Sequence, residues 1–348
     1  MKNMNLRFGL RIMLVAVMSF IVFSLKAGDI KVKTGEAKLK VGENTYSKLQ
    51  LSNTFTTLNY RNIKTDNGNF TELEIPEYGS SNAVGMPKLP MLRKLIEVPL
   101  GATVDVKIVS YSVTEYKLSD YGITNQLMPA QPPVSKDATK KLPDFVQNIA
   151  AYTINQFNTD ELVTVEILGE MRGVRIARVN IAPVRYNPVT NTVQVYNDIK
   201  VEVTFPGADV PQTMALKRNT YSHYFESMFG NQLVNFKSSH TAKDTMSKYP
   251  VKYVIVSDPA FQTALQPFIQ WKTKKGFTVV EAYTNNIAVG NTTTSIKNYL
   301  EGLYNAGTVS NPAPTFVLFV GDVAQIPAFA GNTGTQPTDL YYCEYTGD

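Results

Sequence analysis

The hydrophobic period of this chain changes near Pro250, and that change constrains the fold more than any other feature. Before it, apolar and polar residues alternate in short runs, the period of a strand with one face in water. After it, continuous apolar runs alternate with stretches of helical period. Because 348 residues are about twice the length of a typical domain, we expect two folded units of different class.

The first unit, residues 29–237, is predicted to be all-β. Strand-like runs separated by turn residues extend through it; the clearest are 103–109, 163–168, 174–181, 192–195 and 199–205. The segment 187–191, which contains Pro188, predicts a hairpin turn between two of these runs. Regular short strands of this kind are typical of an antiparallel sandwich or a barrel.

Three segments of this part lack a strand pattern. Residues 128–143 are rich in proline and have no apolar period, so they predict a surface loop. Residues 221–234 predict a short amphipathic helix. Residues 235–248 are polar and unpatterned, which predicts an exposed linker, and we place the linker proper at 238–249.

The second unit, residues 250–348, is predicted to be α/β. Apolar strands are expected at 251–256, 277–282 and 315–320, with one helix opening at Asp258 and another at 295–304. A kink or a break is expected in the first helix at Pro267. The order βαβαβ predicts a parallel sheet with right-handed crossovers. Three strands make an incomplete open sheet, so we expect the chain to be the front part of a longer polypeptide.

Residues 1–28 predict a secretory signal peptide. Basic residues precede an apolar run at 12–25, which is too short to span a bilayer, and small residues follow at Ala27 and Gly28. A retained anchor helix is the alternative. No later stretch predicts a membrane span, so we expect a mature chain that is secreted or held at the bacterial surface, exported by way of the periplasm.

Composition excludes several classes of protein. The single cysteine excludes an intramolecular disulfide framework and any cysteine-based zinc finger. The formal net charge of +5 derives mostly from the leader, so we expect no nucleic-acid partner. The first βα turn of the second unit lacks Gly-x-Gly-x-x-Gly, which argues against a dinucleotide site.

A few residues are candidates for chemistry. Asp322 directly follows the third apolar strand, where open parallel sheets bind ligands, although a turn aspartate that caps the backbone is an equal alternative. Thr346 and Asp348 form a second oxygen-rich turn, and such oxygens suit Ca²⁺. Cys343 has no histidine or nucleophile motif beside it, which indicates a bystander thiol. Lys136, in the proline-rich loop, is on composition alone a solvent-exposed lysine.

Several long motifs resemble the gingipain family of secreted bacterial cysteine proteases, and its lysine-specific branch most closely. The motifs are MRGVRIA at 171–177, PVRYNP at 183–188, PKLPMLRKLIEV at 87–98, a Trp-Lys-x-x-Lys-Gly-Phe pattern at 271–277, and TDLYY at 338–342. The resemblance implies an exported zymogen with a β-sandwich prodomain at 29–237 that blocks the active site. It also implies that residues 250–348 are the truncated start of a caspase-like α/β catalytic domain.

The resemblance also implies roles for single residues. The family binds calcium through an aspartate that matches Asp322 and through the turn that matches residues 346–348, where Thr346 replaces a carboxylate. Its prodomains insert a basic side chain into the specificity pocket, and the matching residue is Lys136. The family's catalytic histidine and cysteine motifs are not in this sequence, so no catalytic residue is assigned, and Cys343 stands where the lysine-specific relative has serine.

We therefore expect the N-terminal part of an endopeptidase precursor that cleaves proteins after basic residues, with lysine preferred. Its expected partners are its own catalytic domain and the protein substrates of the full enzyme. The polar linker predicts maturation cleavage at Lys237 or Lys243. Two alternatives remain open: a secreted β-sandwich adhesin or carbohydrate-binding module, and a family member without the catalytic dyad.

Overall fold

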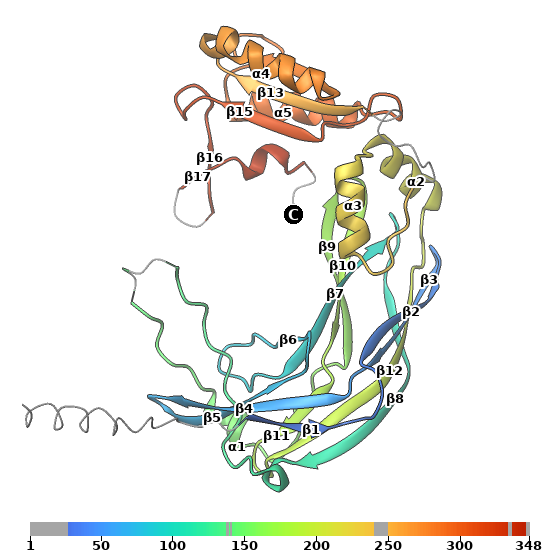
Figure 1. Cartoon of the computed structure of the whole chain (residues 1–348), viewed down its shortest axis with the longest axis vertical. Helices are drawn as coiled ribbons and strands as arrows, with labels where there is room; N and C mark the ends of the chain where they lie inside the picture. Colours follow the sequence, from blue (N-terminus) through green and yellow to red (C-terminus); the bar gives the residue numbers. More distant parts are fainter. Residues whose placement is uncertain (1–26, 137–138, 140, 240–249, 333–335, 346–348) are drawn as a thin grey trace, which may run out of the picture.

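The computed structural model describes residues 27–136, 139, 141–239, 250–332 and 336–345 (Figure 1). Its first part is built from antiparallel sheets and its second from a parallel sheet with helices. This confirms the predicted fold class of a β-sandwich unit followed by an α/β unit.

Two antiparallel sheets form the main sandwich. One has the strand order β6 (Gly79–Ser80), β7 (Pro90–Val98), β10 (Val174–Ile181), β9 (Val163–Met171). The other has the order β11 (Val184–Asn187), β12 (Thr192–Thr204), β3 (Lys48–Thr54), β2 (Lys38–Asn44), and β8 (Asp105–Lys117) also pairs with β12. Ile96 and Ala177 of the first sheet share a fully buried core with Leu49 and Val203 of the second. Apolar side chains at alternate positions supply this core from both sides.

A second core lies at the other end of β12. There a three-stranded sheet in the order β1 (Ala27–Lys31), β4 (Thr57–Thr65), β5 (Gly68–Glu74) places Leu58 against Val193 and Tyr186. β12 is long enough to contribute to both cores, so it ties them together. β1 includes Ala27 and Gly28, the last two residues of the predicted signal peptide.

β12 also corrects one expectation. Residues 192–195 and 199–205 were expected as separate strands, but they form one strand with an irregular register after Asn197. Asp198 there has φ +50°, and the Asn197 side chain bonds both the amide of Phe55, at 3.1 Å, and its carbonyl, at 2.8 Å. Asn197 and Asp198 therefore mark a bulge inside β12 and not the end of a strand.

Helices connect and cover the sheets of this part. The first turn is η1 (Leu118–Tyr121), and α1 (Ile149–Thr153) follows the long loop. α2 (Val210–Asn219) begins at the cap Asp209, whose side chain accepts from the Gln212 amide at 2.9 Å. α3 (His223–Gln232) confirms the amphipathic helix predicted at 221–234, whereas the sequence analysis did not identify α2. Of the loop expected at 128–143, the described residues from Pro133 onward are exposed, but Pro129 and Ala130 are buried.

The second unit has the predicted βαβαβ order. Its parallel sheet runs β14 (Phe277–Tyr283), β13 (Val251–Ser257), β15 (Phe316–Val320), with η2 (Pro259–Phe261), α4 (Gln262–Lys274) and α5 (Thr293–Asn305) as crossovers. Of the kink or break expected at Pro267, the break is ruled out, because α4 continues through it. Pro267 lies in the first half of the helix and removes one hydrogen bond there, while Ile269 keeps the helix on the core.

After β15 the chain forms a hairpin of β16 (Phe329–Ala330) and β17 (Pro337–Thr338), then η3 (Leu340–Cys343). The apolar run at 340–342 is therefore a 3₁₀ turn. It buries Tyr342, whose ring lies 4.6 Å from that of Phe319, and leaves Cys343 exposed. Within the described residues, no helix has the length and apolar character needed to cross a bilayer.

Candidate functional site

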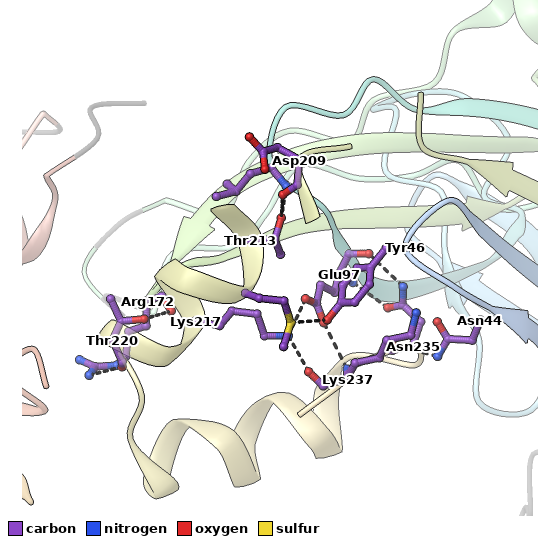
Figure 2. Close-up of polar contacts among 12 residues, drawn as sticks. Asn44, Tyr46, Glu97, Arg172, Asp209, Thr213, Lys217, Thr220, Asn235 and Lys237 are labelled. Carbon is purple, nitrogen blue, oxygen red and sulfur yellow. Dashed lines mark hydrogen bonds and ion pairs between the residues drawn. The ribbon is translucent and has the colours of Figure 1, made fainter. Parts of the chain in front are cut away.

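The segment that leaves α3, residues 233–237, is docked on the sandwich; we call it the exit segment. Its Val234 amide donates to the carbonyl of Leu95 in β7 at 3.0 Å. Asn235 then pairs with the backbone of Glu97, accepting from its amide at 2.7 Å and donating to its carbonyl at 2.9 Å (Figure 2). The expectation that an exposed linker begins at residue 235 is therefore wrong, because its polar groups are satisfied by the edge of β7.

A buried ion pair lies beneath this segment. Lys217, in the last turn of α2, places its Nζ 2.6 Å from Oε1 of Glu97, and their side chains are only 2% and 4% exposed. Buried charges of this kind are costly unless they are paired and their remaining hydrogen-bond groups are satisfied. Here the ammonium group of Lys217 also donates to the carbonyl of Lys237 at 2.6 Å and lies 4.4 Å from the ring centre of Phe236.

Lys237 is the first predicted processing residue, and its amide, its carbonyl and its ammonium group each contact a neighbouring residue. Its amide donates to Oε2 of Glu97 at 3.2 Å, and its carbonyl accepts from Lys217. Its Nζ lies 4.4 Å from the ring centre of Tyr46. Burial lowers the pKa of the Lys237 ammonium, against the opposing pull of Glu97. Burial, reinforced by Glu97, raises the pKa of Tyr46 to about 12, and its hydroxyl donates to Sδ of Met214 at 3.1 Å.

A second contact joins the two units. Arg172 lies in the β9–β10 turn, and its Nη1 donates to the carbonyl of Pro314, just before β15, at 2.5 Å. Its Nη2 donates to the carbonyl of Thr220 at 2.7 Å, and the guanidinium stacks on Phe225 at 4.7 Å. Burial lowers the pKa of Arg172.

Two neighbouring contacts continue this junction. The amide of Ala313 donates to the carbonyl of Asn219 at 3.1 Å. The rings of Tyr224 and Phe316 meet edge to face, 5.1 Å apart. The C-terminal end of α2 thus contacts Arg172 through Thr220 and carries Lys217 in its last turn (Figure 2).

Lys136 lies where the sequence predicted, in an exposed part of the long loop. In Figure 1 this loop projects from the sandwich toward the side on which β16 and β17 lie. Lys141, in the same loop, makes an exposed ion pair with Asp144 at 2.9 Å. Lys243 lies outside the described residues.

Asp322 serves its own turn. Its Oδ1 accepts from the amide of Val323, and its carbonyl accepts from the amides of Gln325 and Ile326 at 2.9 and 2.8 Å. Thr346 and Asp348 lie outside the described residues, and within the described ones no three His, Cys, Asp or Glu side chains gather around a common point. Ca²⁺ takes six to eight oxygen ligands, so Asp322 and its described neighbours do not fit the ion on their own.

Sequence reasoning missed Glu97, Lys217, Asn235 and Arg172 as members of this junction. Glu97 and Lys217 are 120 positions apart, and no local pattern distinguishes either from a surface charge. Only the packing of α2 on β7 brings them together.

Two family profiles match consecutive parts of this chain. The profile of the family described as Propeptide_C25 matches residues 36–240, and that of Peptidase family C25 matches residues 247–348. The chain belongs to the gingipain family. Lys-gingipain of Porphyromonas gingivalis is 39% identical over 306 residues, which cover 88% of this chain and 18% of that protein. Gingipain R1 of the same species is 25% identical over 277 residues, covering 76% of this chain and 26% of its own length.

One solved structure comes from work on the zymogenic latency of gingipain K from Porphyromonas gingivalis. It has 39% sequence identity and a TM-score of 0.49, and the match covers 53% of this chain and all of that one. This gingipain chain spans about a fifth of the length of the Lys-gingipain relatives it matches. Its propeptide match ends just after Lys237, and Arg172 and Pro314 lie in different matched regions.

Proposed function

We propose that this chain is the N-terminal part of a secreted cysteine endopeptidase zymogen in which the propeptide inhibits its own peptidase unit. The observation that carries the proposal is the direct contact between the two matched regions. Arg172 of the propeptide region donates to Pro314 of the peptidase region, and the guanidinium is buried there by Phe225 and Thr220. A propeptide that grips the peptidase unit in this way is suited to keep it latent.

Inhibition is proposed to act through Lys136. The residue is exposed in a proline-rich loop that projects away from the sandwich, so its side chain is free to enter a pocket of the complete peptidase (Figure 1). A pocket for a basic side chain needs a buried acid, and a lysine would pair with it. The proposed specificity of the complete enzyme is cleavage after basic residues, with lysine preferred because Lys-gingipain is the more similar relative.

Two further properties, export and a structural Ca²⁺, are part of the proposal. Export rests on the basic and apolar residues at 1–25 and on the chain's membership of the gingipain family. A structural Ca²⁺ would use Asp322 together with Thr346 and Asp348, and it requires ligands beyond the one described carboxylate.

The proposal is tested with the product of the complete gene. The unprocessed precursor should be latent toward lysyl and arginyl peptide substrates, and the processed enzyme should turn over lysyl peptides with the larger kcat/KM. A precursor that is as active as the processed form would contradict propeptide inhibition. A processed product that cleaves neither substrate would favour a family member without the catalytic dyad.

A further inference from the structure

We infer that the peptide bond between Lys237 and Ser238 is a latched processing site, closed by the Glu97–Lys217 ion pair and opened only when that pair lets go of the exit segment. The inference adds a gate to the proposed maturation, and it rests on the proposed function only in treating cleavage here as maturation. The gate itself is a property of the described contacts.

The latch holds both sides of the bond. On the Lys237 side, the amide is bound by Glu97 and the carbonyl by Lys217. On the other side, the Ser238 hydroxyl bonds the carboxyl group of Glu226 in α3. Both residues flanking the bond are thus fixed by partners from three separate elements: β7, α2 and α3.

The preceding residues are held just as firmly. The carbonyl of Asn235 accepts from the Asn44 side chain at 3.0 Å, in addition to the pair of bonds between its own side chain and Glu97. Leu233 is 4% exposed and makes a bridge to Leu95. The exit segment is therefore held along β7 by an isolated bridge at Leu233 and by the hydrogen bonds of Asn235 (Figure 2).

A protease needs the groups that the latch occupies. It must take the lysine side chain into its specificity pocket, and that side chain lies on the Tyr46 ring. It must also polarise the carbonyl of the bond, which Lys217 already binds. Hydrolysis adds one water across the bond, leaving a carboxylate on Lys237 and an amine on Ser238. Cleavage therefore follows local opening, and its rate tracks the population of the open form.

The ion pair can be tested by replacing both of its residues together. Glu97 and Lys217 are both almost fully buried, so deleting one of them would leave an uncompensated charge in the core. The double variant Glu97→Gln with Lys217→Met keeps the volume and removes both charges. A matched control is Glu72→Gln with Lys88→Met, which removes another ion pair of the β-rich unit, of 2.8 Å, that does not touch the exit segment.

The experiment is native-state digestion of the 348-residue chain with an added lysine-specific endoproteinase, followed by intact-mass spectrometry. Such a protease makes the result independent of whether this chain belongs to an active enzyme. Cleavage after Lys237 is compared with cleavage after Lys243 in the same sample, and cleavage at Lys94 and Lys200 within the sandwich strands reports global unfolding.

In the wild-type chain, cleavage after Lys237 should be at least about tenfold slower than after Lys243. The Glu97→Gln/Lys217→Met variant should bring the two rates within about threefold, with Lys94 and Lys200 still protected. The Glu72→Gln/Lys88→Met control should leave the ratio of the two cleavage rates as it is in the wild type.

Equal rates at Lys237 and Lys243 in the wild type would overturn the inference. An unchanged ratio in the latch variant, with the sandwich still protected, would overturn it too. If the latch variant unfolds, Tyr46→Leu decides, since it frees the Lys237 side chain without touching a buried charge. It should speed cleavage after Lys237 about threefold or more, and no change there would contradict the latch.

Discussion

At the scale of the residue, two buried glutamates of the β-rich unit hold cations in different ways. Glu97 pairs with a lysine that is 2% exposed, whereas Glu72 pairs with Lys88 at 2.8 Å and Arg61 at 2.5 Å, which are 35% and 55% exposed. Burial by itself would raise the pKa of Glu72, but the hydrogen bonds from Lys88 and Arg61 outweigh it, and the pKa is lowered.

This lowered pKa predicts an acid-dependent stability. The contribution of Glu72 is fully present above the unfolded-state pKa of about 4.3 and is lost as the pH falls through the lower folded-state value. Glu72→Gln should therefore reduce the free energy of unfolding by about 1 kcal/mol at pH 7, a modest value because both cations are partly exposed. Urea unfolding should show the two proteins converging toward pH 2. A deficit that stays constant from pH 7 to pH 2 would contradict this assignment.

At the scale of the element, the β9–β10 hairpin meets the end of α2 with no room to spare. Gly173 in its turn has φ +71°, and a Cβ there would lie 2.8 Å from Cγ of Leu216 and 2.9 Å from Oγ1 of Thr220. A side chain at this position is therefore both strained and crowded.

Gly173→Ala should lower the free energy of unfolding by about 2–4 kcal/mol, since strain and crowding add. Gly122→Ala is the matched control, because Gly122 has φ +73° and nothing within 4 Å of the added carbon. It should cost only the strain of the backbone, about 1 kcal/mol. Equal losses in urea unfolding would mean that the hairpin does not press on α2.

The elements also show how far sequence reasoning reaches. The alternating strands of the sandwich and the βαβαβ order were predictable, because each depends on a local period of apolar residues. The sequence of β12 predicts two strands instead of one, because a bulge at Asp198 resembles a strand end locally. α2 was missed because the residue it buries most deeply at its C-terminal end is Lys217, a charge whose partner is remote in sequence.

Dependence on remote partners also explains why the sequence predicts the two candidate lysines but not the docking of the exit segment. Lys136 and Lys237 were singled out because each lies in a loop-like or polar stretch and one has a family counterpart. The docking of the exit segment could not be inferred, since it depends on Asn235 meeting the backbone of Glu97, which is remote from it in sequence. A polar segment is buried only where hydrogen-bond partners are available, and partners that are distant in sequence leave no local pattern.

At the scale of the whole molecule, the contact at Arg172 should couple the two units. Arg172→Met keeps the side chain's apolar stem but removes its bond to Pro314, so the Ala313 amide, which donates to Asn219, should lose protection. Hydrogen exchange at Ala313 should become about tenfold faster. Arg178→Met, which breaks a solvent-exposed pair with Glu166 on the neighbouring strand, is the control and should leave that amide unchanged. Unaltered exchange in Arg172→Met would show that the two units are held together elsewhere.

The whole molecule is proposed to be a zymogen whose propeptide inhibits its own peptidase by presenting Lys136. The direct measurement is the inhibition constant of the processed propeptide against the mature peptidase, both obtained from the complete gene. Lys136→Ala should leave the pocket acid unpaired and raise the constant by about 30-fold or more, the equivalent of at least 2 kcal/mol. Lys136→Arg should be intermediate, because a forked guanidinium does not fit a site shaped for an ammonium. Lys141→Ala, in the same loop, should have little effect. A constant for Lys136→Ala within about twofold of the wild type would contradict the claim.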